Sequence, residues 1–171
     1  MENTYRNFFL LLILFVWSMA EASLAQEVSP KTEAHENGID QDPDEAAVKN
    51  LVERFLAAMG NGDLEAIEPM FLPKATIGGA RFREGKWNTF TTTIEDYLAS
   101  KNENHSPYTE PVSNYTIHIS EGQLAFVKAD AILYREGKAQ SQNMDYFTLL
   151  KDGDSWKFLS AAYTAKPILV K

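Results

Sequence analysis

Residues 141–165, SQNMDYFTLLKDGDSWKFLSAAYTA, contain the pattern that decides the fold. Apolar and polar side chains alternate on both sides of residues 151–154, Lys-Asp-Gly-Asp, and alternation with a period of two is typical of half-buried strands. An Asp-Gly pair between two such runs predicts a tight hairpin. We therefore expect antiparallel strands over residues 139–150 and 156–165.

Further strands are expected before this hairpin. Alternation over residues 112–120 and 124–134 predicts two strands that are joined by a turn at Glu121-Gly122. Residues 75–77 are compatible with a short strand, and we expect the following Gly78-Gly79 pair to end it.

Helical spacing of apolar residues is found nearer the N-terminus. It predicts an amphipathic helix over residues 44–59, with Asp44 in place to cap it, and shorter helices over residues 64–71 and 93–100. Helices followed by an antiparallel meander predict the α+β class.

The first 43 residues are not expected to be part of the folded domain. Residues 8–20 are almost wholly apolar, and Ser23-Leu24-Ala25 follows them, which is typical of a signal peptide over residues 1–25 with cleavage after Ala25. An uncleaved N-terminal anchor stays open as an alternative. Residues 26–43 are polar and acidic and predict a disordered linker, so the domain is expected over residues 44–171.

Composition excludes several classes of function. The 171-residue chain has no cysteine, which rules out disulfides, thiolate catalysis and cysteine-bound metal. Its net charge is -8 and it has no basic run, so we expect no nucleic-acid partner. The three histidines show no metal-binding spacing, and we expect neither a metal site nor a cofactor. Export without cysteine favours a bacterial periplasmic or secreted protein that leaves the membrane once the signal peptide is removed.

Two stretches carry a resemblance to a known superfamily. Residues 51–76, LVERFLAAMGNGDLEAIEPMFLPKAT, and residues 146–158, YFTLLKDGDSWKF, resemble the nuclear transport factor 2-like superfamily, also called SnoaL-like. The resemblance is closest to its secreted branch labelled lumazine-binding-like. It implies a cone-shaped roll of three N-terminal helices packed on a curved antiparallel sheet, and a fold that by itself does not define an activity.

Ketosteroid isomerase, a member of this superfamily, allows a comparison residue by residue. Asp145 resembles the acid that donates a hydrogen bond in the oxyanion hole of that enzyme. The phenol of the oxyanion hole corresponds to Phe55, and the general base corresponds to Gly79, so one donor and the base are both missing. The resemblance therefore implies no steroid isomerase activity.

Asp145 is the candidate on which the function depends. Strand parity places it on one face with Asn143, Phe147 and Leu149, where an apolar environment would raise the pKa of its carboxyl group. Four interpretations stay open: a structural residue satisfied by protein groups, an anchor for a ligand, a catalytic acid or base, and a solvated residue on the outer face.

The other candidates are apolar or aromatic. The face of residues 124–134 opposite Lys128 carries three alanines among its five residues, which leaves room for a cavity. Trp87 lies in the connection before the third helix, where it is a candidate lid. The predicted ligand-binding residues are Asp145, Phe55, Tyr97, Tyr115, Phe147 and Trp87.

Three functions follow from these observations. The first is an exported domain that binds a small apolar ligand and lacks a complete catalytic set. The second is a SnoaL-like isomerase or dehydratase with Asp145 as acid or base. The third is a homodimeric scaffold that associates through the outer face of the sheet, where Phe126, Ile132 and Tyr134 are expected.

Overall fold

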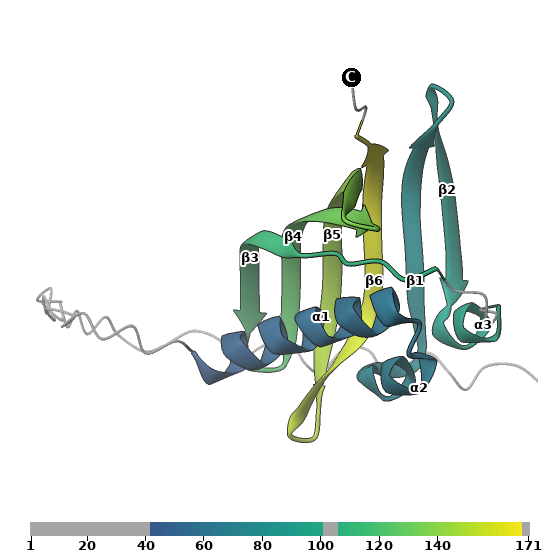
Figure 1. Cartoon of the computed structure of the whole chain (residues 1–171). Helices are drawn as coiled ribbons and strands as arrows, with labels where there is room; N and C mark the ends of the chain where they lie inside the picture. Colours follow the sequence, from purple (N-terminus) through teal and green to yellow (C-terminus); the bar gives the residue numbers. More distant parts are fainter. Residues whose placement is uncertain (1–41, 101–105, 169–171) are drawn as a thin grey trace, which may run out of the picture. The chain divides into compact units, whose positions relative to one another are not determined.

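The computed structural model describes residues 42–100 and 106–168, in which three helices and a short 3₁₀ turn pack on a six-stranded sheet (Figure 1). The predicted signal peptide and nearly all of the predicted linker lie outside the described residues. The helical elements are α1 (Pro43–Asn61), α2 (Leu64–Ile67), the 3₁₀ turn η1 (Glu68–Met70) and α3 (Ile94–Ala99). The strands are β1 (Phe71–Arg83), β2 (Lys86–Thr93), β3 (Val112–Ser120), β4 (Leu124–Arg135), β5 (Lys138–Asp152) and β6 (Ser155–Pro167).

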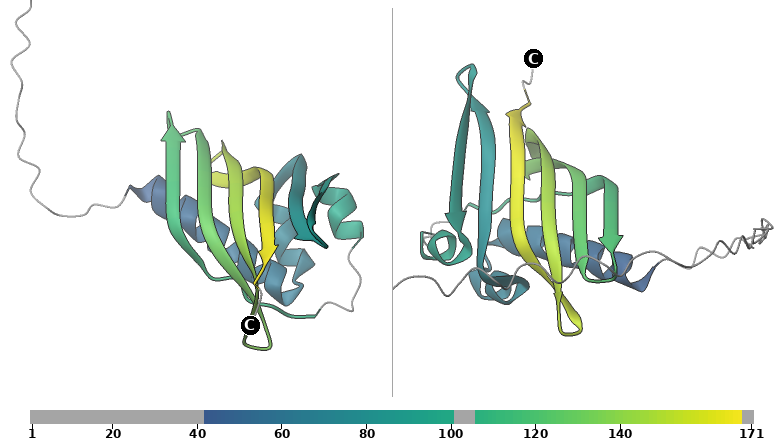
Figure 2. Two further views of the ribbon diagram at one scale, coloured as in Figure 1. Left: turned by 90° about the horizontal axis from the view of Figure 1, so that it is seen from above. Right: turned by 180° about the vertical axis from the view of Figure 1, so that it is seen from behind.

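The strands form one curved sheet in the order β2-β1-β6-β5-β4-β3. Neighbouring strands are antiparallel, as predicted, except that β1 runs parallel to β6. Helix α1 crosses one face of the sheet, and Figure 2 shows that no described helix covers the other face. The α+β class and the roll of three helices on a curved sheet are confirmed. Among the described residues, no helix is long and apolar enough to cross a membrane.

The hairpin of β1 and β2 is the main difference from the sequence prediction. The short strand expected at residues 75–77 is part of a 13-residue strand that continues through Gly78-Gly79 instead of ending there. A Cβ atom on Gly79 would lie 3.0 Å from the Tyr163 carbonyl oxygen and 3.0 Å from the Phe90 ring. Glycine is therefore used here because neighbouring groups approach its backbone closely, and not to make a turn.

The N-terminal cap of α1 also differs from the prediction. Asp42 caps the helix, because its Oδ1 accepts a hydrogen bond from the Asp44 backbone N–H at 2.9 Å. The Asp44 carboxylate instead accepts from Lys151 Nζ at 2.8 Å and from Trp156 Nε1 at 2.9 Å. These bonds lower the pKa of Asp44, and they tie the start of α1 to the β5–β6 hairpin.

The core lies between α1 and the concave face of the sheet. Its centre is a cluster of four phenylalanines, Phe55, Phe71, Phe147 and Phe158, whose ring centroids lie 4.9 to 6.1 Å apart where the rings are in contact. All four are buried. Tilted and edge-on rings at this spacing add to the stability gained from burial alone.

Candidate functional site

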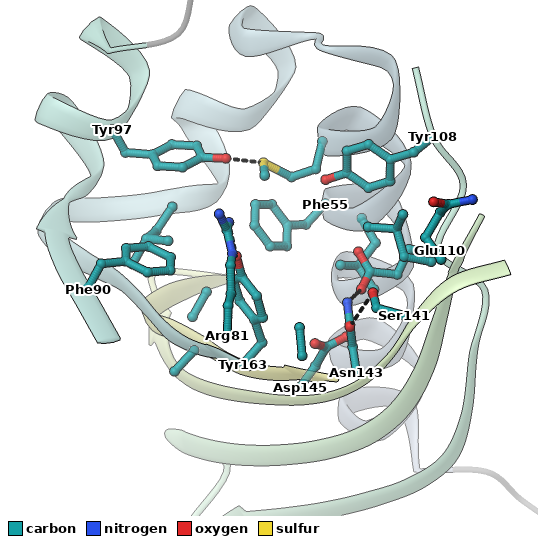
Figure 3. Close-up of a pocket in the computed structure, with 18 of the residues that line it drawn as sticks. Phe55, Arg81, Phe90, Tyr97, Tyr108, Glu110, Ser141, Asn143, Asp145 and Tyr163 are labelled. Atoms are coloured by element: carbon teal, nitrogen blue, oxygen red, sulfur yellow. Dashed lines mark hydrogen bonds between the residues drawn. The ribbon is translucent and has the colours of Figure 1, made fainter. Parts of the chain in front are cut away.

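A pocket of about 470 Å³ lies beside this core. Its floor is the concave face of β5, β6 and β1, and its walls are the C-terminal half of α1, helix α3 and the segment of residues 106–111 that leads into β3 (Figure 3). The volume is within the range of roughly 300–1,000 Å³ that is typical of small-molecule sites.

Alanines occupy three of the four register positions beside Asp145 and Asn143. In the sheet register Asp145 pairs with Ala129 on β4 and Tyr163 on β6, while Asn143 pairs with Ala131 and Ala165. Strand parity is as predicted, since Asn143 and Asp145 are both buried on the concave face. The expected alanine face of β4 is buried as well.

Asp145 is buried without a complete set of partners. Its Oδ2 atom accepts no hydrogen bond from any described residue. Burial, and secondly the charge of Glu110, raise the pKa of the carboxyl group to about 8. At neutral pH the group is therefore mostly protonated, and it offers a hydroxyl donor beside a carbonyl acceptor.

A chain of hydrogen bonds continues from Asn143 along the same wall. Ser141 donates through Oγ to Asn143 Oδ1 at 2.8 Å, and Asn143 donates through Nδ2 to Glu110 Oε1. Burial raises the pKa of Glu110, although the bond from Asn143 partly opposes this. Two acidic groups with raised pKa values thus lie on one side of the pocket.

The opposite side carries Arg81. Its guanidinium group donates from Nε to the Tyr163 hydroxyl at 2.6 Å and lies over the rings of Phe90 and Tyr163, 5.0 and 5.3 Å from their centroids. Above it, the Tyr97 hydroxyl donates to Met59 Sδ at 3.5 Å, and burial raises the pKa of Tyr97 to about 12. The pocket is consequently polar at two ends, and aromatic and aliphatic between them.

Four of the six predicted ligand-binding residues line this pocket, and two do not. Asp145, Phe55, Tyr97 and Phe147 are among the lining residues. Tyr115 lies on β3, where its hydroxyl donates to Glu53 Oε1 at 3.3 Å. Trp87 is 47% exposed and packs edge-on against Phe82, at 5.3 Å, on the β1–β2 hairpin.

Sequence reasoning missed Glu110 and Tyr108 and did not assign Arg81 to the pocket. Glu110 and Tyr108 lie in a segment outside any regular element, so no period marked their direction. Contacts that hold this segment in place include the pairing of Thr109 with Tyr134 and the hydrogen bond from Tyr108 N–H to the Gly60 carbonyl at 3.0 Å.

Phe55 and Gly79, which correspond to the phenol and the general base of ketosteroid isomerase, have other roles in this structure. Phe55 belongs to the phenylalanine cluster. The space beside Gly79 is filled by Phe90 and Tyr163, whose ring centroids are 5.9 Å apart. The described residues contain no group of three or more histidine, aspartate or glutamate side chains placed to hold a metal ion.

The fold and the pocket define a nuclear transport factor 2-like domain. The chain belongs to the family whose model is described as "Putative lumazine-binding" and matches residues 43–164. A comparison with curated proteins found no match.

Solved structures support the fold at low sequence identity. A nuclear transport factor 2-like protein of unknown function from Shewanella baltica OS155 is 20% identical with a TM-score of 0.54, covering 72% of this chain and 94% of its own. A protein of unknown function with a cystatin-like fold from Nostoc punctiforme PCC 73102 is 12% identical with a TM-score of 0.58, covering 73% and 92%. A "putative dehydratase" of this fold from Streptomyces avermitilis is 17% identical with a TM-score of 0.56, covering 74% and 97%.

Proposed function

We propose that this domain binds a small, flat heterocycle that carries ring N–H and C=O groups side by side, as lumazine does. The observation that carries the proposal is the Asp145 carboxyl group, which lines a pocket of suitable volume and has one oxygen without a hydrogen-bond partner among the described residues. A protonated carboxyl group presents a donor and an acceptor together, which complements the N–H and C=O groups of such a ring. The description of the family supports the same ligand class.

The lining between the polar ends suits a ring system. Phe55, Phe147 and Tyr97 offer apolar surface, and Arg81 is already stacked on aromatic rings. An enclosed, mainly apolar site with few polar groups gives affinity through burial and orientation through hydrogen bonds.

Fluorescence titration of the purified protein with lumazine tests the proposal. Asp145→Asn keeps a donor and an acceptor and should retain binding, whereas Asp145→Leu should weaken it by roughly 10- to 100-fold, since a lost hydrogen bond in a buried site costs about 1–3 kcal/mol. Gln142→Leu, on the outer face of the same strand, is the matched control and should leave binding unchanged. Equal lumazine affinity in wild type and Asp145→Leu would contradict the role of Asp145.

A second candidate, acid–base catalysis in the same pocket, is favoured by one observation. A carboxyl group with a pKa of about 8 is suited to proton transfer near neutral pH. In this case the protein should catalyse the exchange of deuterium into the acidic methyl position of 6,7-dimethyllumazine. Proton NMR would measure the rate of this exchange. Exchange no faster than in Asp145→Asn would count against catalysis of this step.

We also propose export and self-association. The apolar stretch and the small residues before Gln26 support cleavage after Ala25, into the periplasm or the medium. N-terminal sequencing of the protein from its host would test this, since a chain that starts at Met1 contradicts it.

Association through the outer face of the sheet is supported by its exposed apolar side chains. Phe126, Ile132 and Tyr146 are each more than a third exposed. The predicted homodimer should dissociate in Phe126→Lys, measured by analytical ultracentrifugation. A wild-type protein that stays monomeric at high concentration would contradict the dimer.

A further inference from the structure

The hairpin of β1 and β2 concentrates positive charge in an acidic protein. Arg81, Arg83 and Lys86 line an open hollow on this hairpin together with polar residues, and Glu84 is the one acidic side chain in its lining. The whole chain has a net charge of -8. Three cations around one hollow are therefore not a consequence of overall composition.

In the part of the chain that the structure describes, these cations also lack a carboxylate partner. Within residues 42–100 and 106–168, none of the three takes part in an ion pair, whereas Lys151 and Lys157 lie 2.8 and 2.7 Å from carboxylates. Arg83 and Lys86 are exposed, and Arg81 donates only to the neutral hydroxyl of Tyr163. The positive charge of the hollow is thus available to a bound group.

The hollow and the pocket share part of their lining. Arg81, Arg83 and Phe90 line both of them. In the sheet register Arg81 pairs with Ala165, and Ala165 pairs with Asn143, so a single small residue separates Arg81 from the polar wall that includes Asp145. The hairpin projects beyond the neighbouring strands, which places the hollow at the rim (Figure 1).

Arg81 is held at the boundary between the two spaces. Tyr163 and Phe90 fix its guanidinium group by a hydrogen bond and by stacking, and Gly79 makes their close approach possible (Figure 3). A planar guanidinium group with a fixed orientation is well suited to recognise a phosphate or carboxylate.

We propose that the β1–β2 hairpin is a second subsite, which binds the phosphate or carboxylate substituent of the same ligand whose ring lies against Asp145. The ligand is then a neutral heterocycle with an anionic side chain that leaves the pocket past Arg81. The shared ligand rests on the proposed function, while the anion subsite rests on the hairpin alone.

The anion subsite is tested without the ring by titrating the protein with pyrophosphate and recording the arginine Nε–Hε resonances by NMR. Saturable shifts at Arg81 and Arg83 are expected, together with at least roughly tenfold weaker binding in Arg83→Gln/Lys86→Gln, because charged hydrogen bonds to the anion are lost. Lys128→Gln/Lys157→Gln removes the same charge from other strands and should bind as the wild type does. No shift, or equal binding in all three proteins, would overturn the subsite.

The shared ligand is tested with riboflavin and riboflavin 5′-phosphate, which have the same imide-bearing ring and differ by one phosphate. Quenching of flavin fluorescence should show the phosphate ester binding about tenfold tighter to the wild type, with that preference lost in Arg83→Gln/Lys86→Gln. Equal affinity of the two flavins, or binding of neither, would overturn the shared ligand. Neither result alters the lumazine titration, which tests the ring site separately.

Discussion

The two ends of strand β5 on the concave face are equally buried and chemically opposite. Leu149 and Phe147 are 0% and 3% exposed and face the core, whereas Asp145 and Asn143 are 3% and 4% exposed and face the pocket. At the core end, the register pairs Phe147 with Val127 and Ala161. Across the face, helix α1 contributes Phe55 to the same end.

Burial therefore has opposite effects on stability at the two ends of this strand. Burial of apolar side chains stabilises the core end by roughly 1.5–3 kcal/mol for each large residue. Burial of an acid without a full set of partners opposes folding. The buried Asp145 carboxyl group is therefore expected to lower stability where the buried phenylalanines raise it.

The largest effect is expected at the core end. Phe158→Ala removes the ring that contacts three other phenylalanines, and it should lower the free energy of unfolding by about 3–5 kcal/mol in urea titrations. Leu159→Ala is the matched control, since Leu159 is exposed and should change stability by less than about 0.5 kcal/mol. Similar losses in both variants would show that the phenylalanine cluster is not the centre of the core.

At the polar end, stability should depend on pH through Asp145. Its pKa is about 8 in the folded protein against an ordinary value of 3.8, so between these pH values the folded state keeps a proton that the unfolded state has already released. The contribution of protonated Asp145 to stability is therefore fully present below pH 4 and is lost as pH rises towards 8, with a slope of up to about 1.4 kcal/mol per pH unit.

Asp145→Asn removes this ionisable group, so the unfolding free energy of the variant should depend less steeply on pH. At pH 7 the variant should also have a higher unfolding free energy than the wild type. Glu110 has a raised pKa in both proteins and contributes a slope of the same sign. Urea titrations from pH 4 to 8 measure the difference between them. Identical slopes would mean that Asp145 is ionised when folded.

The packing of α1 against the pocket wall is tested at Gly60, whose backbone contacts Tyr108. Helix propensity alone would make Gly60→Ala stabilising by up to about 1 kcal/mol. The structure predicts the opposite sign, a loss of about 1–3 kcal/mol, because the new Cβ would overlap the Tyr108 carbonyl oxygen. Hydrogen exchange at the Tyr108 amide should also accelerate, and a stabilised variant with unchanged exchange would rule out this packing.

The smallest effect is expected at Ser141. Ser141→Ala removes the hydrogen bond to Asn143 Oδ1 and should cost about 0.5–1.5 kcal/mol of unfolding free energy. Gln142→Ala, whose side chain points to the outer face, is the control in the same urea titrations. A larger loss at Gln142 would contradict the hydrogen-bond chain.

The sequence predicted most of the fold because the period of the apolar residues is clear. The strands β3 to β6 alternate regularly, and α1 has helical spacing. Strand β2, KWNTFTTT, was missed since it is mostly exposed and polar at the sheet edge. The continuation of β1 through Gly78-Gly79 was also missed. A glycine pair more often marks a turn than a place where aromatic rings approach the backbone.

The candidate site was only partly predictable. Parity gave the direction of Asp145, since the strand around it is regular. Strand parity also placed Tyr115 on the concave face. It did not predict that Tyr115 lies under α1, where Lys49 lies over the Tyr115 ring. The other charged residues of the pocket come from outside the segments with a predicted period, and only tertiary structure brings Glu110 and Arg81 to the same pocket as Asp145.

The structure of the protein crystallised with lumazine would test most directly whether the polar end of the concave face is a ligand site. We expect a ring in the pocket beside Phe55 and Tyr163, with its N–H and C=O groups within hydrogen-bond distance of Asp145. A pocket without lumazine, with both Asp145 oxygens bonded to protein groups, would contradict it and make Asp145 a structural residue.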